Sequence, residues 1–110
     1  MLFRSELFDS CEIIESINFI KFNRSDIINM SNMFYRCSSL KEINLSNFNT
    51  NNVIYMDGMF FKCSSLKELD LSNFNTNNVI NMEGMFYECS EQLKNKIESE
   101  YKNIKEEAFL

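Results

Sequence analysis

The sequence MFYRCSSLKEINLSNFNTNNVIYMDG, residues 33–58, is followed directly by a second version of itself at residues 59–84. Of the 26 paired positions, 20 are identical. A repeat of this length is typical of proteins built from supersecondary units that pack one against the next. We therefore expect residues that lie 26 positions apart in the sequence to be neighbours in the folded chain.

A more divergent third copy precedes these two at residues 7–32, where eight positions match residues 33–58. The shared positions are chiefly apolar, which predicts that they form the core. With 110 residues the whole chain, 1–110, is expected to be a single domain. Within it we expect residues 1–6 to be an N-terminal cap or a partial unit, residues 85–90 to start a fourth copy, and residues 91–110 to form a C-terminal helix.

The hydrophobic period changes within each copy, and this change predicts the local structure. From Leu40 to Leu45 apolar and polar residues alternate, as in a short strand with Glu42 and Asn44 facing outward. The polar residues 49–52 that follow predict a turn. Apolar residues then recur at helical spacing, which predicts a helical return in each copy; they are Val53, Met56, Met59, Phe60 and Cys63.

Equivalent positions of the copies are expected to form rows of like side chains. One such position holds Asn32, Gly58 and Gly84, and this exchange of Asn with Gly predicts a positive φ angle there. Asn23, Asn49 and Asn75 form either a hydrogen-bonded row or a set of exposed turn residues. The predicted interior rows are Phe22, Phe48 and Phe74; Met30, Met56 and Met82; and Phe8, Phe34, Phe60 and Phe86.

The segment CSSLKELDLSNFNTNNVINMEGMF, residues 63–86, resembles the BspA-like leucine-rich repeat family. The resemblance rests on the patterns Cys-Ser-Ser-Leu, Leu-x-Leu-Ser-x-Phe-x-Thr-x-x-Val and Met-x-x-Met-Phe, and with a weaker first copy it extends over residues 7–89. It implies an α/β repeat fold, a short leucine-rich-repeat solenoid with one short parallel strand and a helical return per coil. It also implies a surface-exposed protein of bacteria, some protists or large viruses that acts in adhesion and binding.

The last twenty residues predict an amphipathic helix. Ser90 is suited to the N-cap position and Glu91 to the first helical turn. The apolar face then recurs at intervals of three or four residues, through Leu93, Ile97, Tyr101, Ile104 and Ala108. This face is expected to cap the open end of the repeats; a partner-binding helix is the alternative.

The four cysteines, at positions 11, 37, 63 and 89, are each 26 residues apart. Sulfur atoms in a row cannot converge on a tetrahedral zinc ion, so we expect no metal site and favour buried thiols over disulfides. The chain has no histidine, which excludes Cys-His and Ser-His-Asp catalysis. It also lacks a glycine-rich phosphate loop, so the sequence indicates no cofactor and no enzyme. A redox or metal protein that uses the cysteine row is a remote alternative.

The formal net charge of −5 argues against a nucleic-acid partner and favours a basic protein partner. No apolar run approaches the length of about 20 residues that a membrane span requires, so we expect no membrane insertion. No secretory signal is visible at the start of the sequence. These observations predict a cytoplasmic protein or a piece trimmed from a surface protein.

The outward positions of the expected strands are the candidate binding residues. The function that we expect is non-enzymatic protein binding through this strand face, flanked by Lys41 and Lys67. The alternative is a structural or assembly subunit that self-associates through the ends of its repeats or through its terminal helix. The candidate residues are Ser16, Asn18, Glu42, Asn44, Glu68 and Asp70.

Overall fold

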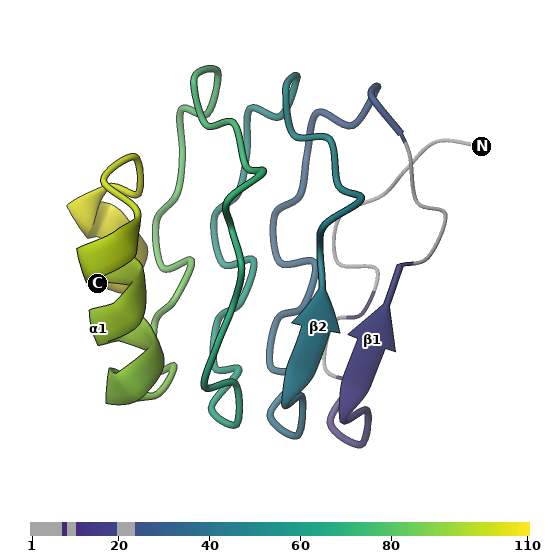
Figure 1. The fold of residues 1–110 in the computed structure, drawn as a ribbon, viewed down its shortest axis with the longest axis vertical. Coiled ribbons are helices and arrows are strands. Elements are labelled where there is room, and N and C mark those ends of the chain that lie inside the picture. Colours follow the sequence, from purple (N-terminus) through teal and green to yellow (C-terminus); the bar gives the residue numbers. More distant parts are fainter. Residues whose placement is uncertain (1–7, 9–10, 20–23) are drawn as a thin grey trace.

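The computed structural model describes residues 8, 11–19 and 24–110. Two short strands, β1 (Ser16–Asn18) and β2 (Glu42–Asn44), pair in parallel with Ile17 opposite Ile43 (Figure 1). The α-helix α1 (Glu91–Glu100) and the 3₁₀-helix η1 (Glu106–Phe109) follow at the C-terminal end. The predicted N-terminal part, residues 1–6, and Phe22 and Asn23 of the predicted rows lie outside the described residues.

Backbone hydrogen bonds join residues of successive sequence copies. Phe34 donates its N–H to the Met59 carbonyl at 2.9 Å, and Phe60 donates to the Met85 carbonyl at the same distance. Tyr55 forms parallel bridges with Asn29 on one side and with Asn81 on the other. The predicted neighbourhood of residues about 26 positions apart is therefore present in the backbone, and the corresponding chain segments run side by side (Figure 1).

The predicted helical return of each copy is wrong. Where it was expected, Phe61 donates its N–H three residues back to the Gly58 carbonyl (3.1 Å), while the intervening Phe60 bonds across to Met85. Here tight turns alternate with backbone hydrogen bonds to the neighbouring copy. This arrangement gives the same apolar spacing as an α-helix, but it lacks the i to i−4 hydrogen bonds of a helix. Positive φ angles allow these turns: the predicted one at Gly58 (+63°) is confirmed, whereas the one at Lys62 (+60°) was not anticipated.

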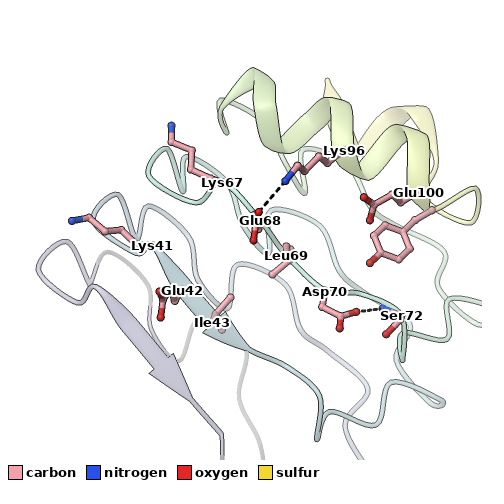
Figure 2. Close-up of a pocket in the computed structure, with 11 residues that line it drawn as sticks. Lys41, Glu42, Ile43, Lys67, Glu68, Leu69, Asp70, Ser72, Lys96 and Glu100 are labelled. Atoms are coloured by element: carbon pink, nitrogen blue, oxygen red, sulfur yellow. Dashed lines mark hydrogen bonds and ion pairs between the residues drawn. The ribbon is translucent and has the colours of Figure 1, made fainter.

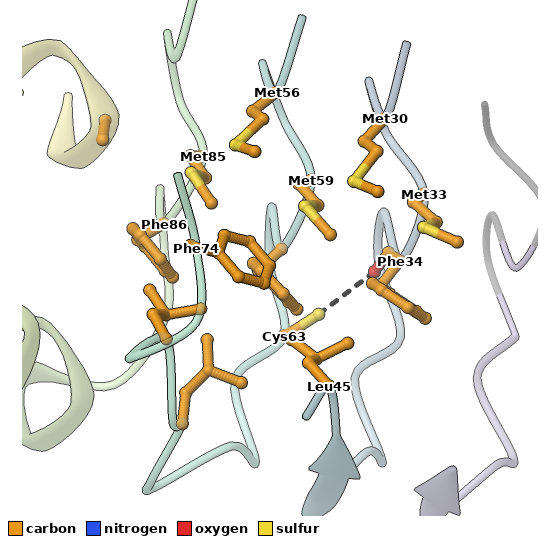
Figure 3. Close-up of a cluster of buried hydrophobic side chains, with 14 of the residues drawn as sticks. Met30, Met33, Phe34, Leu45, Met56, Met59, Cys63, Phe74, Met85 and Phe86 are labelled. Atoms are coloured by element: carbon orange, nitrogen blue, oxygen red, sulfur yellow. Dashed lines mark hydrogen bonds between the residues drawn. The ribbon is translucent and has the colours of Figure 1, made fainter. Parts of the chain in front are cut away.

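Phenylalanine rings form the centre of the interior. Phe8, Phe34, Phe60 and Phe86 stack in a row with ring centroids 5.4 to 5.6 Å apart, and Phe109 of η1 extends the row at 5.7 Å. Methionines, leucines and the cysteine row pack around them (Figure 3). All four cysteines are free thiols, and those at positions 37, 63 and 89 each donate to a phenylalanine carbonyl at 3.0 or 3.1 Å.

Polar side chains also link the copies, although in a different arrangement from the predicted asparagine row. Asn49 accepts a hydrogen bond from the Asn51 backbone within its own turn, so its role is local. The links between copies come from Thr50, which is 1% exposed and bonds both backbone groups of Asn75, and from Asn73, which donates to the Phe48 carbonyl at 2.8 Å. Among the described residues, the Thr50 hydroxyl and the Phe48 carbonyl therefore find hydrogen-bond partners in the neighbouring copy.

The C-terminal helix is shorter than predicted. Ser90 caps α1 by accepting the Leu93 N–H at 3.1 Å, as expected, but α1 ends at Glu100 instead of residue 110. Tertiary hydrogen bonds outcompete its continuation, because the carbonyls of Glu107 and Ala108 accept the N–H groups of Gly84 and Phe86 (3.0 and 2.7 Å). The apolar face of α1 is nevertheless buried against the interior.

The predicted fold class is also wrong. The described residues form a small compact globule with two parallel strands and one α-helix, and not a leucine-rich-repeat solenoid. Its Cα radius of gyration is 12.6 Å and its extents are 33 × 30 × 19 Å. The third expected strand, around residues 68–70, does not form; next to it, Leu71 donates its N–H to the Tyr101 hydroxyl of the C-terminal segment. No helix in the described part of the chain has the length and apolar character needed to cross a membrane.

Candidate functional site: a charged groove beside the C-terminal helix

An open groove of about 840 Å³ lies between β2, residues 67–72 and helix α1 (Figure 2). We refer to it as the charged groove. Its floor includes the apolar side chains of Ile43 and Leu69, and charged side chains surround them. These are Lys41, Glu42, Lys67, Glu68, Asp70, Lys96 and Glu100.

Three of the six predicted residues lie in this groove. Glu42 points outward from β2 because Ile43, the next residue, faces the interior, and although residues 68–70 form no strand, Glu68 and Asp70 are likewise exposed on either side of the buried Leu69. Ser16, Asn18 and Asn44 lie elsewhere, in a smaller hollow of about 390 Å³ over β1 and β2 that shares only Glu42 and Ile43 with the charged groove.

Two exposed ion pairs organise the lysines of the groove. Lys96 of α1 reaches Glu68 at 3.0 Å, and Lys41 reaches Glu15 at 3.0 Å. The carboxylates are 78% and 66% exposed, so each pair contributes at most about 1 kcal/mol to folding. Weak, solvated ion pairs of this kind can be exchanged for contacts with a partner at small cost.

Asp70 is held more firmly than the other acids. Its carboxylate accepts the Ser72 backbone N–H at 2.9 Å, and its neighbour Leu71 bonds the Tyr101 hydroxyl at 3.1 Å. Hydrogen bonds from Ser72, together with one from Tyr101, hold the pKa of Asp70 below its usual range. Asn44 occupies the equivalent position of β2 and likewise accepts from the Ser46 backbone (2.9 Å), so both residues have a role in fixing a turn.

Sequence reasoning missed the wall of the groove that α1 supplies. Lys96, Glu100 and Tyr101 line it, although none of them was a candidate. A signal for them exists in the helical pattern: Lys96 and Glu100 are four residues apart and so share one helix face, and Lys96 directly precedes the buried Ile97. What the sequence could not supply was the orientation of the helix beside residues 67–72.

No cysteine lines the groove, and its carboxylates form no metal-binding cluster among the described residues. Within residues 8, 11–19 and 24–110, no three His, Cys, Asp or Glu side chains are placed to hold a metal ion. The thiols are remote from it, and burial raises the pKa of Cys89 to about 12 and that of Cys63 as well. The groove presents charged and hydrogen-bonding side chains at an open surface.

These features define a small compact domain with an open, mixed-charge groove. The chain belongs to the family described as "Mycoplasma protein of unknown function, DUF285", whose model matches residues 4–108. Comparison with curated proteins and with solved structures gives no significant match.

The family match corrects the resemblance to BspA-like leucine-rich repeats, and with it the expectation of a leucine-rich-repeat surface protein. The patterns that suggested it, such as Cys-Ser-Ser-Leu, describe buried interior positions and the turns next to them. In this structure Cys63 and Leu66 are buried and the two serines between them lie in a turn. Such patterns report local packing requirements, which proteins of different families can share.

Proposed function

We propose that this protein is a non-enzymatic module that binds a protein partner through the charged groove. The observation that carries the proposal is the grouping of Glu42, Glu68 and Asp70 with three lysines around a partly apolar floor. Alternating charges next to apolar side chains favour a specific, salt-sensitive protein interface.

The charges favour a partner with a basic segment. Four carboxylates of the groove stand against three lysines, and two of those lysines already pair with Glu68 and Glu15. Glu42 and Glu100 take part in none of the ion pairs found among the described residues, which leaves them able to meet cations of a partner.

The alternative of assembly through the terminal helix has less support. Leu93 and Ile97, the apolar face that such an assembly would use, are 0% and 1% exposed because they pack against the interior of the same chain. Sedimentation at increasing concentration tests this alternative directly, and growth of a dimer or larger species would favour it over the groove.

Partner capture with variants tests the proposal. The double variant Glu42→Lys/Glu68→Lys reverses two charges in the groove, and Glu12→Lys/Glu98→Lys reverses two exposed charges outside it. Each protein is immobilised, incubated with lysate from the native source and compared by quantitative mass spectrometry. We expect proteins captured by the wild type and by the control variant to be lost from the groove variant. Unchanged capture by a folded groove variant would refute the proposal.

A further inference from the structure

A second hollow, of about 300 Å³, shares no residue with the charged groove. It is built from equivalent positions of the second, third and partial fourth sequence copies, and we refer to it as the glycine trough. Its floor is glycine, one wall is aromatic and the other carries carboxylates. The residues that define it are Asp57, Gly58, Phe61, Glu83, Gly84 and Tyr87.

The floor is open at Gly84, which lacks a side chain, whereas the Asn32 amide oxygen fills the equivalent space at Gly58. Gly58 and Gly84 have φ angles of +63° and +66° and donate their N–H groups to the next segment of chain, at Glu83 and Glu107 (both 3.0 Å). A Cβ added to Gly84 would lie 3.7 Å from the Phe61 ring and 3.9 Å from the Tyr87 Cβ. A side chain at this position would therefore occupy the space between floor and aromatic wall.

The aromatic wall presents ring edges. Phe61 is stacked between Tyr35 (centroids 4.6 Å apart) and Tyr87 (5.2 Å apart), so both of its faces are covered. A ring edge carries partial positive charge and does not attract a cation, but it packs well against methylene groups. The wall is therefore suited to the aliphatic stem of a ligand and unsuited to its charged end.

The opposite wall supplies the charge. Asp57 is half-buried and accepts the Ser31 hydroxyl, which fixes its carboxylate, while Glu83 is exposed. None of the ion pairs among the described residues involves either carboxylate. Two acids in one hollow, without a cation from the same chain, leave a negative potential for a ligand to neutralise.

The first sequence copy closes the trough. Ser31 stands where the later copies have Asp57 and Glu83, so the acidic wall stops there. Asn32 stands where they have glycine, and its amide oxygen occupies the space that a Cβ on Gly58 would need. The trough is thus a property of the second and third copies together with Tyr87 of the partial fourth copy.

We propose that the glycine trough binds an arginine side chain of a basic peptide. The methylene stem lies over the glycine floor against the edges of Phe61 and Tyr87. The guanidinium group donates to Asp57 and Glu83, because its planar array of five N–H groups can reach two carboxylates at once. The ammonium group of a lysine is a single point charge, so it is less suited to contacting both carboxylates at once.

The two glycines provide a direct test by NMR, because they are the only glycines in the chain and both form the floor. The ¹⁵N-labelled protein is titrated with N-acetyl-arginine amide at low ionic strength, and the two glycine amide signals are followed. We expect both signals to shift in a saturable way with a dissociation constant of about 1 mM, as befits one side chain. The lysine analogue should bind more weakly, and the uncharged citrulline analogue should produce no saturable shift.

Matched variants separate recognition from general charge attraction. Asp57→Asn/Glu83→Gln keeps the size and one acceptor oxygen of each group, and should weaken binding at least about tenfold through loss of two charge-assisted contacts. Glu12→Gln/Glu98→Gln removes the same charge elsewhere and should bind as the wild type does. No saturable glycine shift, or an equal loss in both variants, would overturn the proposal. The charged-groove variant Glu42→Lys/Glu68→Lys should show the same glycine shifts as the wild type. The result for the glycine trough is therefore independent of whether the charged groove binds a partner.

Discussion

Phe60 lies in the interior between Phe34 and Phe86, whereas its neighbour in the chain, Phe61, lies at the surface between Tyr35 and Tyr87. The interior position holds phenylalanine in all four copies, while the surface position holds aspartate in the first copy and tyrosine, phenylalanine and tyrosine in the next three. The interior row must fill a fixed space, so any change there opens a cavity or creates strain. The surface row has only to maintain the stack, and this freedom allows the nearby walls of the glycine trough to differ between copies.

Truncating the two phenylalanines should produce the largest difference. Phe60→Ala removes a ring that is 0% exposed and stacked on both sides, and we expect it to lower the free energy of unfolding by about 3 to 5 kcal/mol. Phe61→Ala removes a half-exposed ring and should cost about 1 kcal/mol. Urea denaturation followed by circular dichroism measures both. Similar costs for the two variants would show that the interior and surface rows have been assigned incorrectly.

Alanine at the two glycines should produce the next largest effect. Both residues have positive φ angles, which cost an alanine about 1 kcal/mol, and at Gly58 the new Cβ also collides with the Asn32 amide oxygen. We expect Gly58→Ala to cost about 2 kcal/mol and Gly84→Ala about 1 kcal/mol in the same urea experiment.

A third variant identifies the cause of that difference. In an Asn32→Gly background the collision is absent, so Gly58→Ala should cost only about as much as Gly84→Ala, about 1 kcal/mol. If the cost stays near that measured in the wild type, Asn32 is not responsible and the floor of the glycine trough is more crowded than the structure indicates.

The sequence predicted the rows because a row requires only a repeated residue type at a fixed interval. Phe34, Phe60 and Phe86 illustrate this, as does the positive φ angle shared by Asn32 and Gly58. The sequence-based prediction failed where hydrogen bonds between copies determine the backbone conformation. The apolar spacing of residues 53–63 is compatible with a helix or with linked turns, and only the presence of carbonyl acceptors on the neighbouring segment selects the turns.

Only those features of the candidate site that depend on a local sequence pattern could be predicted. Strand alternation placed Glu42, Glu68 and Asp70 outward from their own sequence alone. Lys96 and Tyr101 join them only because α1 lies across residues 67–72, a packing direction that no local pattern encodes. The glycine trough was not foreseen at all, since its two walls come from positions that carry no recognisable motif.

A smaller change in stability is expected at Tyr101, which joins the surface to the interior. Its hydroxyl accepts the N–H of Leu71, a residue that is 2% exposed, at 3.1 Å. Tyr101→Phe removes this acceptor, and we expect a loss of about 1 kcal/mol because the donor is left without a partner. The thermal midpoint measured by calorimetry reports the change. An unaltered midpoint would mean that water replaces the hydroxyl, and that the α1 wall of the charged groove is less closely joined to residues 67–72.

The smallest effect is expected at Asp70, on the exposed side of the same contact, and it should depend on pH. Hydrogen bonds from Ser72 and Tyr101 lower the pKa of the folded state below the usual value, so this carboxylate stabilises the fold when the pH is above its unfolded pKa of about 3.9. That contribution is lost as the pH falls through the lower folded pKa.

Asp70→Asn keeps an oxygen that can accept the Ser72 N–H but has no charge to titrate. The wild type should therefore be more stable than the variant at pH 7 by less than about 1 kcal/mol, because the site is exposed to solvent. The difference in thermal midpoint should shrink steadily below pH 4. A difference that persists unchanged at pH 2 would show that the shape of the turn, and not the charge of Asp70, accounts for its role at the edge of the charged groove.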